Sequence, residues 1–202
     1  MLFRSRLVDS AALVADEGRL SPEEEARRER QRTSSLAGIV DYEFSSDGNS
    51  LLLPLAGDLF LYDLRAPAGR SPVRRLTSTA EAETDARFSP DGRRVSFVRD
   101  QNLYVIDLST GAERAVSSDG RALVSYGTAE FIAQEEMDRS TGYWWSPDGT
   151  RIAYTRVDES TVDEVERFEI FADGVKVVRQ RYPAAGRPNA RVELLVAEIA
   201  GD

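Results

Sequence analysis

Cysteine and histidine are both absent from this chain of 202 residues. Without them the chain has no disulfide, no cysteine nucleophile, no Cys/His zinc site and no Ser-His-Asp catalytic relay of its own. The amino terminus also lacks a long apolar run, because Asp9 and Asp16 interrupt it. We therefore expect no metal site, no cofactor, no contact with a membrane and no signal peptide within these residues.

Positive charge is also in short supply. The chain has 35 acidic and 26 basic residues, which gives a formal net charge of -9. This sign opposes binding to the phosphates of nucleic acid, so we expect no nucleic-acid partner and instead a cationic or amine-bearing one. Hydrophobic residues make up 41% and charged residues 30% of the chain, a balance typical of one or two globular domains at this length.

The sequence contains an internal repeat. A motif of an aromatic residue followed by Ser-Ser-Asp-Gly or Ser-Pro-Asp-Gly occurs three times, at residues 44–48, 88–92 and 145–149. A second motif, at residues 58–64 and 102–108, keeps the 44-residue offset between the first two turns. Proline and aspartate favour a turn and glycine accepts a positive φ, so each copy predicts a β-hairpin and no catalytic role.

A period of this length, filled with short strands, is typical of a four-stranded propeller blade. We therefore predict a mainly β fold with about three four-stranded blades of an incomplete β-propeller, at about residues 41–84, 85–128 and 142–202. In the third blade, Asp173 and Gly174 lie between two strand-like runs and predict an additional hairpin. Because known propellers have about four to eight blades, three blades cannot close a ring.

A short helical arm precedes the blades. Ser21 stands at the position of an N-cap, Pro22 in the first turn and Glu24 three residues after the cap, which is the pattern of a helix start. We expect a helix at about residues 22–32, within an amino-terminal arm of residues 1–40. Polar residues occupy nearly all its sides, so the sequence alone predicts a solvated helix.

One segment breaks the period of the repeat. Residues 129–139 are inserted before the third turn, so that the second and third turns are 57 residues apart. The insert carries Glu135 and Glu136, which would diverge in a strand but would lie about 100° apart on a helical turn and converge on one cation. Two close carboxylates repel each other, which favours a positively charged group such as a substrate ammonium. An ordinary solvated acidic pair is the alternative.

The residues around this insert resemble a known family. After Glu135 and Glu136 come TGYWWSPDG at 141–149 and RYPAAGRPN at 181–189, and the arm contains ARRERQR at 26–32 followed by GIVDY at 38–42. Together these motifs closely resemble dipeptidyl peptidase IV and its bacterial relatives in the prolyl oligopeptidase family. The Ser-Pro-Asp-Gly turns alone are a weak signal because many propellers contain them, whereas the double glutamate before the tryptophan pair is specific.

The resemblance implies a propeller that covers a separate carboxyl-terminal α/β-hydrolase domain and admits peptides by their free amino end. Glu135 and Glu136 would bind the peptide α-ammonium and place the bond after the second residue, usually Pro or Ala, at the serine nucleophile. Relatives also contact a peptide carbonyl with an arginine, which is missing between residues 51 and 64; Arg32, or Arg30 beside it, is the substitute we expect. The resemblance leaves open a homodimer of the intact protein, and a location in the periplasm or the cytoplasm of a bacterium.

The chain departs from the family in one decisive respect. It contains neither a Gly-x-Ser-x-Gly nucleophile elbow nor a histidine, so we predict that these residues alone hydrolyse no peptide and form the recognition part of a serine exopeptidase. The alternative is a non-enzymatic interaction scaffold similar to the Tol-associated periplasmic propellers. That alternative explains the repeats equally well, but it does not explain the double glutamate, the extra hairpin or Trp144 beside Trp145. We expect Trp144 to face away from Trp145 and to pack against the insert.

Overall fold

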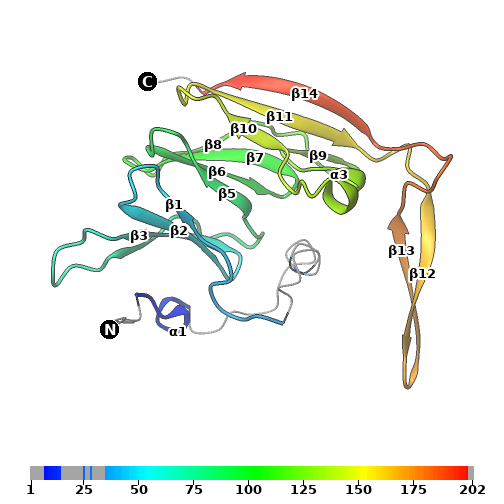
Figure 1. Cartoon of the computed structure of the whole chain (residues 1–202), viewed down its shortest axis with the longest axis horizontal. Helices are drawn as coiled ribbons and strands as arrows, with labels where there is room; N and C mark the ends of the chain where they lie inside the picture. The colour runs from blue at the N-terminus through cyan, green and yellow to red at the C-terminus, as the bar shows by residue number, and fades with distance from the viewer. Residues whose placement is uncertain (1–6, 15–24, 26–27, 29–34, 200–202) are drawn as a thin grey trace. The chain divides into compact units, whose positions relative to one another are not determined.

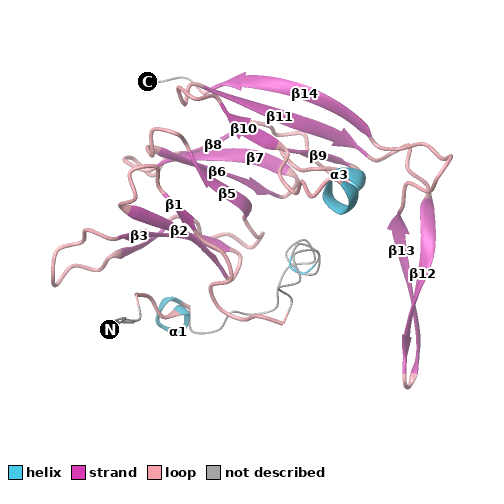
Figure 2. Ribbon diagram, viewed as in Figure 1, coloured by secondary structure: helices cyan, strands magenta, loops and turns pink. Residues whose placement is uncertain are grey.

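The computed structural model describes residues 7–14, 25, 28 and 35–199, and these residues form mainly antiparallel β-strands (Figures 1 and 2). The mainly β class and the four-stranded sheets predicted from the repeat are confirmed. The chain divides into two compact units, one made of residues up to 100 together with 104–115, and the other made of residues 101–103 together with 116–202.

The first two sheets follow the repeat, with consecutive strands as neighbours. The strands of the first sheet are β1 (Glu43–Phe44), β2 (Ser50–Leu55), β3 (Asp58–Asp63) and β4 (Val73–Arg75). Those of the second are β5 (Thr84–Phe88), β6 (Arg94–Arg99), β7 (Asn102–Asp107) and β8 (Glu113–Ala115). Consecutive residues of β2 and β6 are buried, so both faces of these strands are covered. The main cluster consists of Leu52, Leu59, Phe88, Val95, Phe97 and Ile106. Burial of these side chains supplies the main driving force for folding of this unit.

The three repeated turns have the same internal hydrogen bonds. In each, the serine hydroxyl donates to the aspartate carboxylate at 2.5–2.7 Å, and the serine oxygen accepts the N–H of the residue five positions later at 2.9 Å. The glycines adopt φ values of 68° or 69°, a left-handed conformation that a Cβ disfavours. The serines are Ser45, Ser89 and Ser146, the aspartates Asp47, Asp91 and Asp148, and the glycines Gly48, Gly92 and Gly149. The turns are therefore structural, as the sequence predicts.

The amino-terminal segment covers one face of the first sheet. Helix α1 (Ser10–Leu13) is capped by Asp9, whose carboxylate accepts the N–H of Ala11 at 3.3 Å. Beside α1, the Tyr62 hydroxyl donates to the carbonyl oxygen of Leu7 at 3.1 Å. The apolar residues of this segment that pack on the sheet are Val8, Leu13 and Val14. The segment thus covers apolar surface of β2 and β3 that would otherwise be in water.

The helix predicted at 22–32 lies largely outside the described residues. Glu25 and Arg28 are described, and both have helical backbone. Arg28 is buried, and its guanidinium donates to the carbonyl oxygen of Leu36 at 3.1 Å. This arginine is therefore not part of a wholly solvated face, because burying a guanidinium requires compensating hydrogen bonds.

The third sheet differs from the first two in its first strand, which is divided into two pieces. Its strands are β9 (Val124–Tyr126), β10 (Tyr143–Trp145), β11 (Arg151–Asp158) and β14 (Arg191–Glu198). Strand β14 pairs along one edge of β11, while β9 and β10 pair with different halves of the other edge. The edge strand that β9 and β10 form is thus interrupted by residues 127–142. Because β9 belongs to this sheet, the third sheet begins earlier than the start near residue 142 expected from the repeat.

One face of the third sheet carries exposed apolar side chains. The pairing of Trp144 with Ala153 and of Ala153 with Val196 places these residues on the same face. The exposed members of this face are Trp144, Val192, Leu194 and Val196, at 41%, 49%, 67% and 65% exposure. We call these four residues the open face of the third sheet.

The predicted extra hairpin is present. Strands β12 (Glu164–Phe171) and β13 (Gly174–Arg181) pair over their full length in a two-stranded sheet, with Phe171 opposite Gly174. The two loop residues are therefore Ala172 and Asp173, one position earlier than the Asp-Gly pair suggested. Gly174 is the first residue of a strand, where no positive φ is required.

Candidate functional site

The insert contains a short helix that carries the paired glutamates. Helix α3 (Phe131–Glu136) begins after Glu130, whose carboxylate accepts the N–H groups of Ile132 at 2.6 Å and of Ala133 at 2.9 Å. An N-cap carboxylate accepts hydrogen bonds from amide groups that have no partner within the helix. Its negative charge also interacts favourably with the positive end of the helix dipole. Glu130 is the residue directly before the helix, which is the N-cap position. Its carboxylate therefore has a structural role, unlike those proposed for Glu135 and Glu136.

The other end of α3 is closed by a reversal of the backbone. Asp138 adopts a φ of 49°, and the N–H of Arg139 then donates to the carbonyl oxygen of Ala133 at 2.9 Å. Aspartate is one of the few residues with a side chain that tolerates this left-handed conformation. The helix therefore ends at Glu136, and Met137 is its C-cap.

The two ends of the insert are held together at the third sheet. Thr128 and Thr141 form an antiparallel bridge, and the hydroxyl of buried Thr155 on β11 donates to the carbonyl oxygen of Thr128 at 2.6 Å. A Cβ on Gly142 would lie 2.2 Å from that same oxygen, so only glycine fits there. The insert is thus a closed loop on a rigid base, which is the usual way a scaffold positions binding residues.

Glu135 and Glu136 are the last two residues of α3, at its carboxyl end. Both side chains are exposed, and α3 has no basic residue in its last turn. The carboxyl end of a helix carries a partial negative charge from its terminal carbonyl groups. Two carboxylates at this end concentrate negative potential on one exposed spot, which favours binding of an external cation. The helical turn on which the sequence analysis placed this pair is present, whereas the convergence of the two carboxylates on one cation stays a prediction.

Arg139, the nearest basic residue along the chain, has two contacts within the third sheet and the insert. The guanidinium of Arg139 donates to the carbonyl oxygen of Thr141 at 2.8 Å, and its central carbon lies 5.7 Å from the ring centroid of Trp144. This geometry is that of a cation–π contact. The expectation that Trp144 packs against the insert is therefore confirmed, although its partner is an arginine that the sequence analysis did not single out.

A second ring contact lies at the beginning of α3. The rings of Phe131 and Tyr182 meet edge to face, with centroids 5.3 Å apart and planes at 72°. Tyr182 directly follows β13 and is 40% exposed. No local pattern indicates this contact, because the two aromatics lie 51 positions apart along the chain.

The expected arginine of the site cannot be placed. Arg32 and its neighbour Arg30 both lie outside the described residues. Their proposed contact with a peptide carbonyl therefore stays a prediction.

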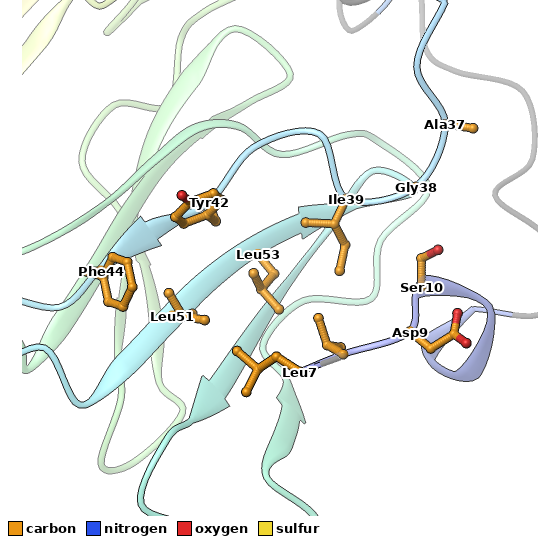
Figure 3. A pocket seen from close by; sticks show the side chains of 11 residues that line it. Leu7, Asp9, Ser10, Ala37, Gly38, Ile39, Tyr42, Phe44, Leu51 and Leu53 are labelled. Atoms are coloured by element: carbon orange, nitrogen blue, oxygen red, sulfur yellow. The ribbon is translucent and has the colours of Figure 1, made fainter. Parts of the chain in front are cut away.

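A cavity of about 510 Å³ lies in the first unit, between the amino-terminal segment and the first sheet. Figure 3 shows the aliphatic side chains of Leu7, Ile39, Leu51 and Leu53 along its walls, with Tyr42 and Phe44 at one side. Its polar lining comes from Asp9 and Ser10 of the α1 start, and the carboxylate of Asp9 already caps that helix. The cavity is therefore mainly the apolar gap that α1 leaves on the sheet, and it contains no cluster of groups suited to catalysis.

Two further observations apply to the part of the chain that the structure describes. It has no group of three or more acidic residues arranged to hold a metal ion. Neither does it contain a helix of the length and apolar character that crossing a bilayer requires.

Comparison with known proteins indicates the family of the chain. The family model described as the dipeptidyl peptidase IV N-terminal region matches residues 45–202. Dipeptidyl peptidase 8 of Mus musculus is 28% identical over 224 aligned positions, which cover 100% of this chain and 25% of the relative. A probable dipeptidyl-aminopeptidase B of Aspergillus oryzae is 36% identical over 131 positions, which cover 58% of this chain and 14% of the relative.

A solved structure supports the same assignment. The crystal structure of Porphyromonas gingivalis dipeptidyl peptidase 4 matches with a TM-score of 0.69 and 30% identity, over 85% of this chain and 26% of that one. The chain thus spans about a quarter of the length of these two relatives, the mouse protein and the solved structure. Since the family model covers well over half of the chain, the chain belongs to the family of dipeptidyl peptidase IV N-terminal regions.

Proposed function

We propose that this chain is the substrate-recognition part of a serine exopeptidase that releases amino-terminal dipeptides, with Pro or Ala preferred at the second position. Residues 1–40 form its arm and residues 41–202 its partial propeller. In this proposal Glu135 and Glu136 bind the α-ammonium of the peptide, and a carboxyl-terminal α/β-hydrolase domain supplies the nucleophile. The proposal accounts for the absence of histidine from the chain.

The observation that carries the proposal is the position of the two carboxylates. They are exposed at the carboxyl end of α3, on a loop whose ends are bridged at Thr128 and Thr141. A peptide ammonium carries three N–H donors and one positive charge, so it can satisfy both carboxylates at once. Charge-assisted hydrogen bonds of this kind are roughly twice as strong as neutral ones. A site of fixed position that binds the amino end also determines how far along the peptide the cleaved bond lies.

The test compares a free peptide with its acetylated form. We would measure binding of Ala-Pro-Ala amide and acetyl-Ala-Pro-Ala amide to the chain by NMR titration, before and after the double change Glu135→Gln/Glu136→Gln. The free peptide should bind more tightly to the unmodified chain, and the double change should weaken its binding about tenfold or more, the range for hydrogen bonds to charged groups. Equal binding of the two peptides to the unmodified chain would overturn the proposal.

A matched control separates local from overall charge. The double change Glu164→Gln/Asp173→Asn removes the same number of negative charges from exposed positions of the β12–β13 hairpin. It should leave binding of the free peptide unchanged. If it weakens binding as much as the change at α3, the effect comes from net charge and the assignment of Glu135 and Glu136 fails.

Arg32, with Arg30 as its neighbour, is the residue we propose for the carbonyl of the bound peptide. The change Arg32→Ala should weaken binding of the free and the acetylated peptide by the same factor, because a carbonyl contact does not involve the amine. No loss with Arg32→Ala, in a chain that still discriminates the two peptides, would remove Arg32 from the site.

We also propose that the intact protein forms a homodimer through the β12–β13 hairpin. Near its loop one face of the hairpin is apolar and exposed, at Phe168 (59%), Ile170 (80%), Val175 (60%) and Val177 (50%). An isolated two-stranded sheet is only marginally stable in water, so this face gains from burial. A second copy presents the same face, which allows a symmetric contact.

A further inference from the structure

Helix α3 is too short to fix its own direction. It has six residues, a length of about 9 Å, and isolated helices of this size are unstable in water. Ala133 is its only buried residue. A single small buried side chain gives little resistance to tilting, so the direction of α3 depends on the contacts at its two ends.

Each end of the helix segment is held by one ring contact. At the beginning, the ring of Phe131 meets the ring of Tyr182 edge to face, with centroids 5.3 Å apart. After the end, Arg139 lies over the ring of Trp144. Trp144 belongs to β10 and is fixed by its pairing with β11.

Tyr182 is held by the backbone at the base of the β12–β13 hairpin. Its N–H donates to the carbonyl oxygen of Asp163 at 3.0 Å, and its own carbonyl oxygen accepts the N–H of Ala184 at 2.9 Å. The carboxylate of Asp163 in turn binds the guanidinium of Arg187. Pro183 restricts the backbone of Tyr182 further. The ring of Tyr182 is therefore presented from a rigid segment although it is partly exposed.

The contact reaches the glutamates through the geometry of the helix. Phe131 and Glu135 are four residues apart, so they lie on the same face of α3, one above the other. A tilt of the helix would therefore change the direction in which Glu135 points together with that of Phe131. Glu136 is the next residue and moves with the same turn.

We propose that Tyr182 is a positioning residue that acts through Phe131 to hold the carboxylates of Glu135 and Glu136 in place for an amine-bearing peptide. This inference rests on the proposed function of the glutamate pair. It assigns a role to the segment after the hairpin, which contacts α3 through the ring of Tyr182. Tyr182 acts by ring packing, so its hydroxyl is dispensable.

The test measures how well the chain distinguishes free from acetylated Ala-Pro-Ala amide. Tyr182→Leu removes the ring and keeps an apolar side chain, whereas Tyr182→Phe keeps the ring and removes only the hydroxyl. Because an aromatic pair is a modest interaction, we expect Tyr182→Leu to reduce the affinity ratio of the two peptides about two- to tenfold. Tyr182→Phe should retain the ratio of the unmodified chain.

A second variant tests the path of the effect. Phe131→Leu should reduce the ratio as much as Tyr182→Leu, and the double variant should be no worse than either single one, because all three remove the same contact. Additive losses would show that Tyr182 acts otherwise than through Phe131 and would overturn the inference. Tyr182→Leu is set aside if it unfolds at a much lower urea concentration than the unmodified chain. In that case the affinity ratio of the two peptides is compared between Phe131→Leu, which should lower it, and Tyr182→Phe, which should retain it.

The outcomes separate this inference from the proposal on which it rests. If the unmodified chain binds the free and acetylated peptides equally, the ammonium site itself fails. If the unmodified chain discriminates and loses this with Glu135→Gln/Glu136→Gln, but Tyr182→Leu keeps the full ratio, the site stands and the positioning role is wrong.

Discussion

The hydroxyl of Thr155 lies 2.6 Å from the carbonyl oxygen of Thr128 and 3.1 Å from that of Gly142. One side chain of β11 therefore contacts both ends of the loop that carries α3. This arrangement connects a central strand of the third sheet to the position of the paired glutamates. It also explains why glycine is needed at 142, since any larger residue would occupy the space of the Thr128 carbonyl group.

The base of the loop should be sensitive to a single methyl group. In Gly142→Ala the new Cβ would lie 2.2 Å from the oxygen and 2.4 Å from the carbon of the Thr128 carbonyl, and backbone atoms move only at a cost. We expect a loss of about 2–3 kcal/mol in the free energy of unfolding, the upper part of the range for overpacking. Urea unfolding monitored by tryptophan fluorescence measures this loss of stability. Gly174→Ala is the control, since its Cβ meets nothing within 4 Å, and a similar loss there would contradict the explanation.

The hydrogen bonds of the repeated turns should lower the pKa values of the turn aspartates. Hydrogen bonds from the Ser146 hydroxyl and from the N–H and hydroxyl of Thr150 lower the pKa of Asp148 to about 2, from an ordinary value of 3.8. Because the folded pKa is the lower one, the stability from these bonds is present above pH 3.8 and is lost as the pH falls through about 2.

Ser146→Ala removes the first of these donors, so we expect it to raise the pKa of Asp148 toward 3.8. The carboxyl carbon signal in an NMR titration measures the change. Asp107, whose pKa is also about 2 because of Ser109 and Thr110, should not respond to Ser146→Ala. An unchanged Asp148 would mean that the hydroxyl contributes little to the turn.

The hairpin should control self-association. Ile170 is 80% exposed in the apolar face, so Ile170→Lys should not disturb folding but should oppose burial of that face. We expect the dimer of the intact protein to dissociate at concentrations at which the unmodified protein stays dimeric, as measured by analytical ultracentrifugation. Gln180→Lys, on the opposite face of the hairpin, is the matched control. A dimer that survives Ile170→Lys would place the contact elsewhere.

The chain by itself should release no dipeptide from a chromogenic Ala-Pro substrate. It contains no histidine to act as a general base and no nucleophile elbow. The assay is the initial rate with the purified chain, alongside a mock purification that lacks it. Turnover above the mock sample that also disappears with Glu135→Gln/Glu136→Gln would refute the prediction, because a contaminant would not depend on these residues.

Features encoded by short, local motifs could be predicted from the sequence. The turn at Ser146 and Asp148 needs only residues within five positions of each other, so the repeat predicts its place. The same holds for the helical turn that carries Glu135 and Glu136, which lies within the short insert. The long hairpin was also predicted, but its loop is one residue earlier because the register depends on pairing along all of β12 and β13.

Features that depend on distant pairing could not be predicted. Strand β9 has three residues, and nothing in Val124–Tyr126 indicates that it pairs with β11. The sequence therefore does not predict that β9 and β10 form one interrupted edge strand of the third sheet. The contact of Phe131 with Tyr182 depends on how the hairpin returns to the sheet. Helix α1 has four residues and is stabilised by packing on the first sheet, for which its own sequence carries no clear pattern.

The open face of the third sheet has a consequence for the thermodynamics of the chain. Trp144, Val192, Leu194 and Val196 are already in contact with water before unfolding begins. Unfolding therefore hydrates less additional apolar surface than it does in a typical domain, where the heat capacity rises by about 12–15 cal/mol/K per residue. A smaller increment makes the dependence of stability on temperature flatter. Any polypeptide that covers this face should restore the curvature, so calorimetry of the chain with and without such a neighbour reports directly on how much of the face is buried.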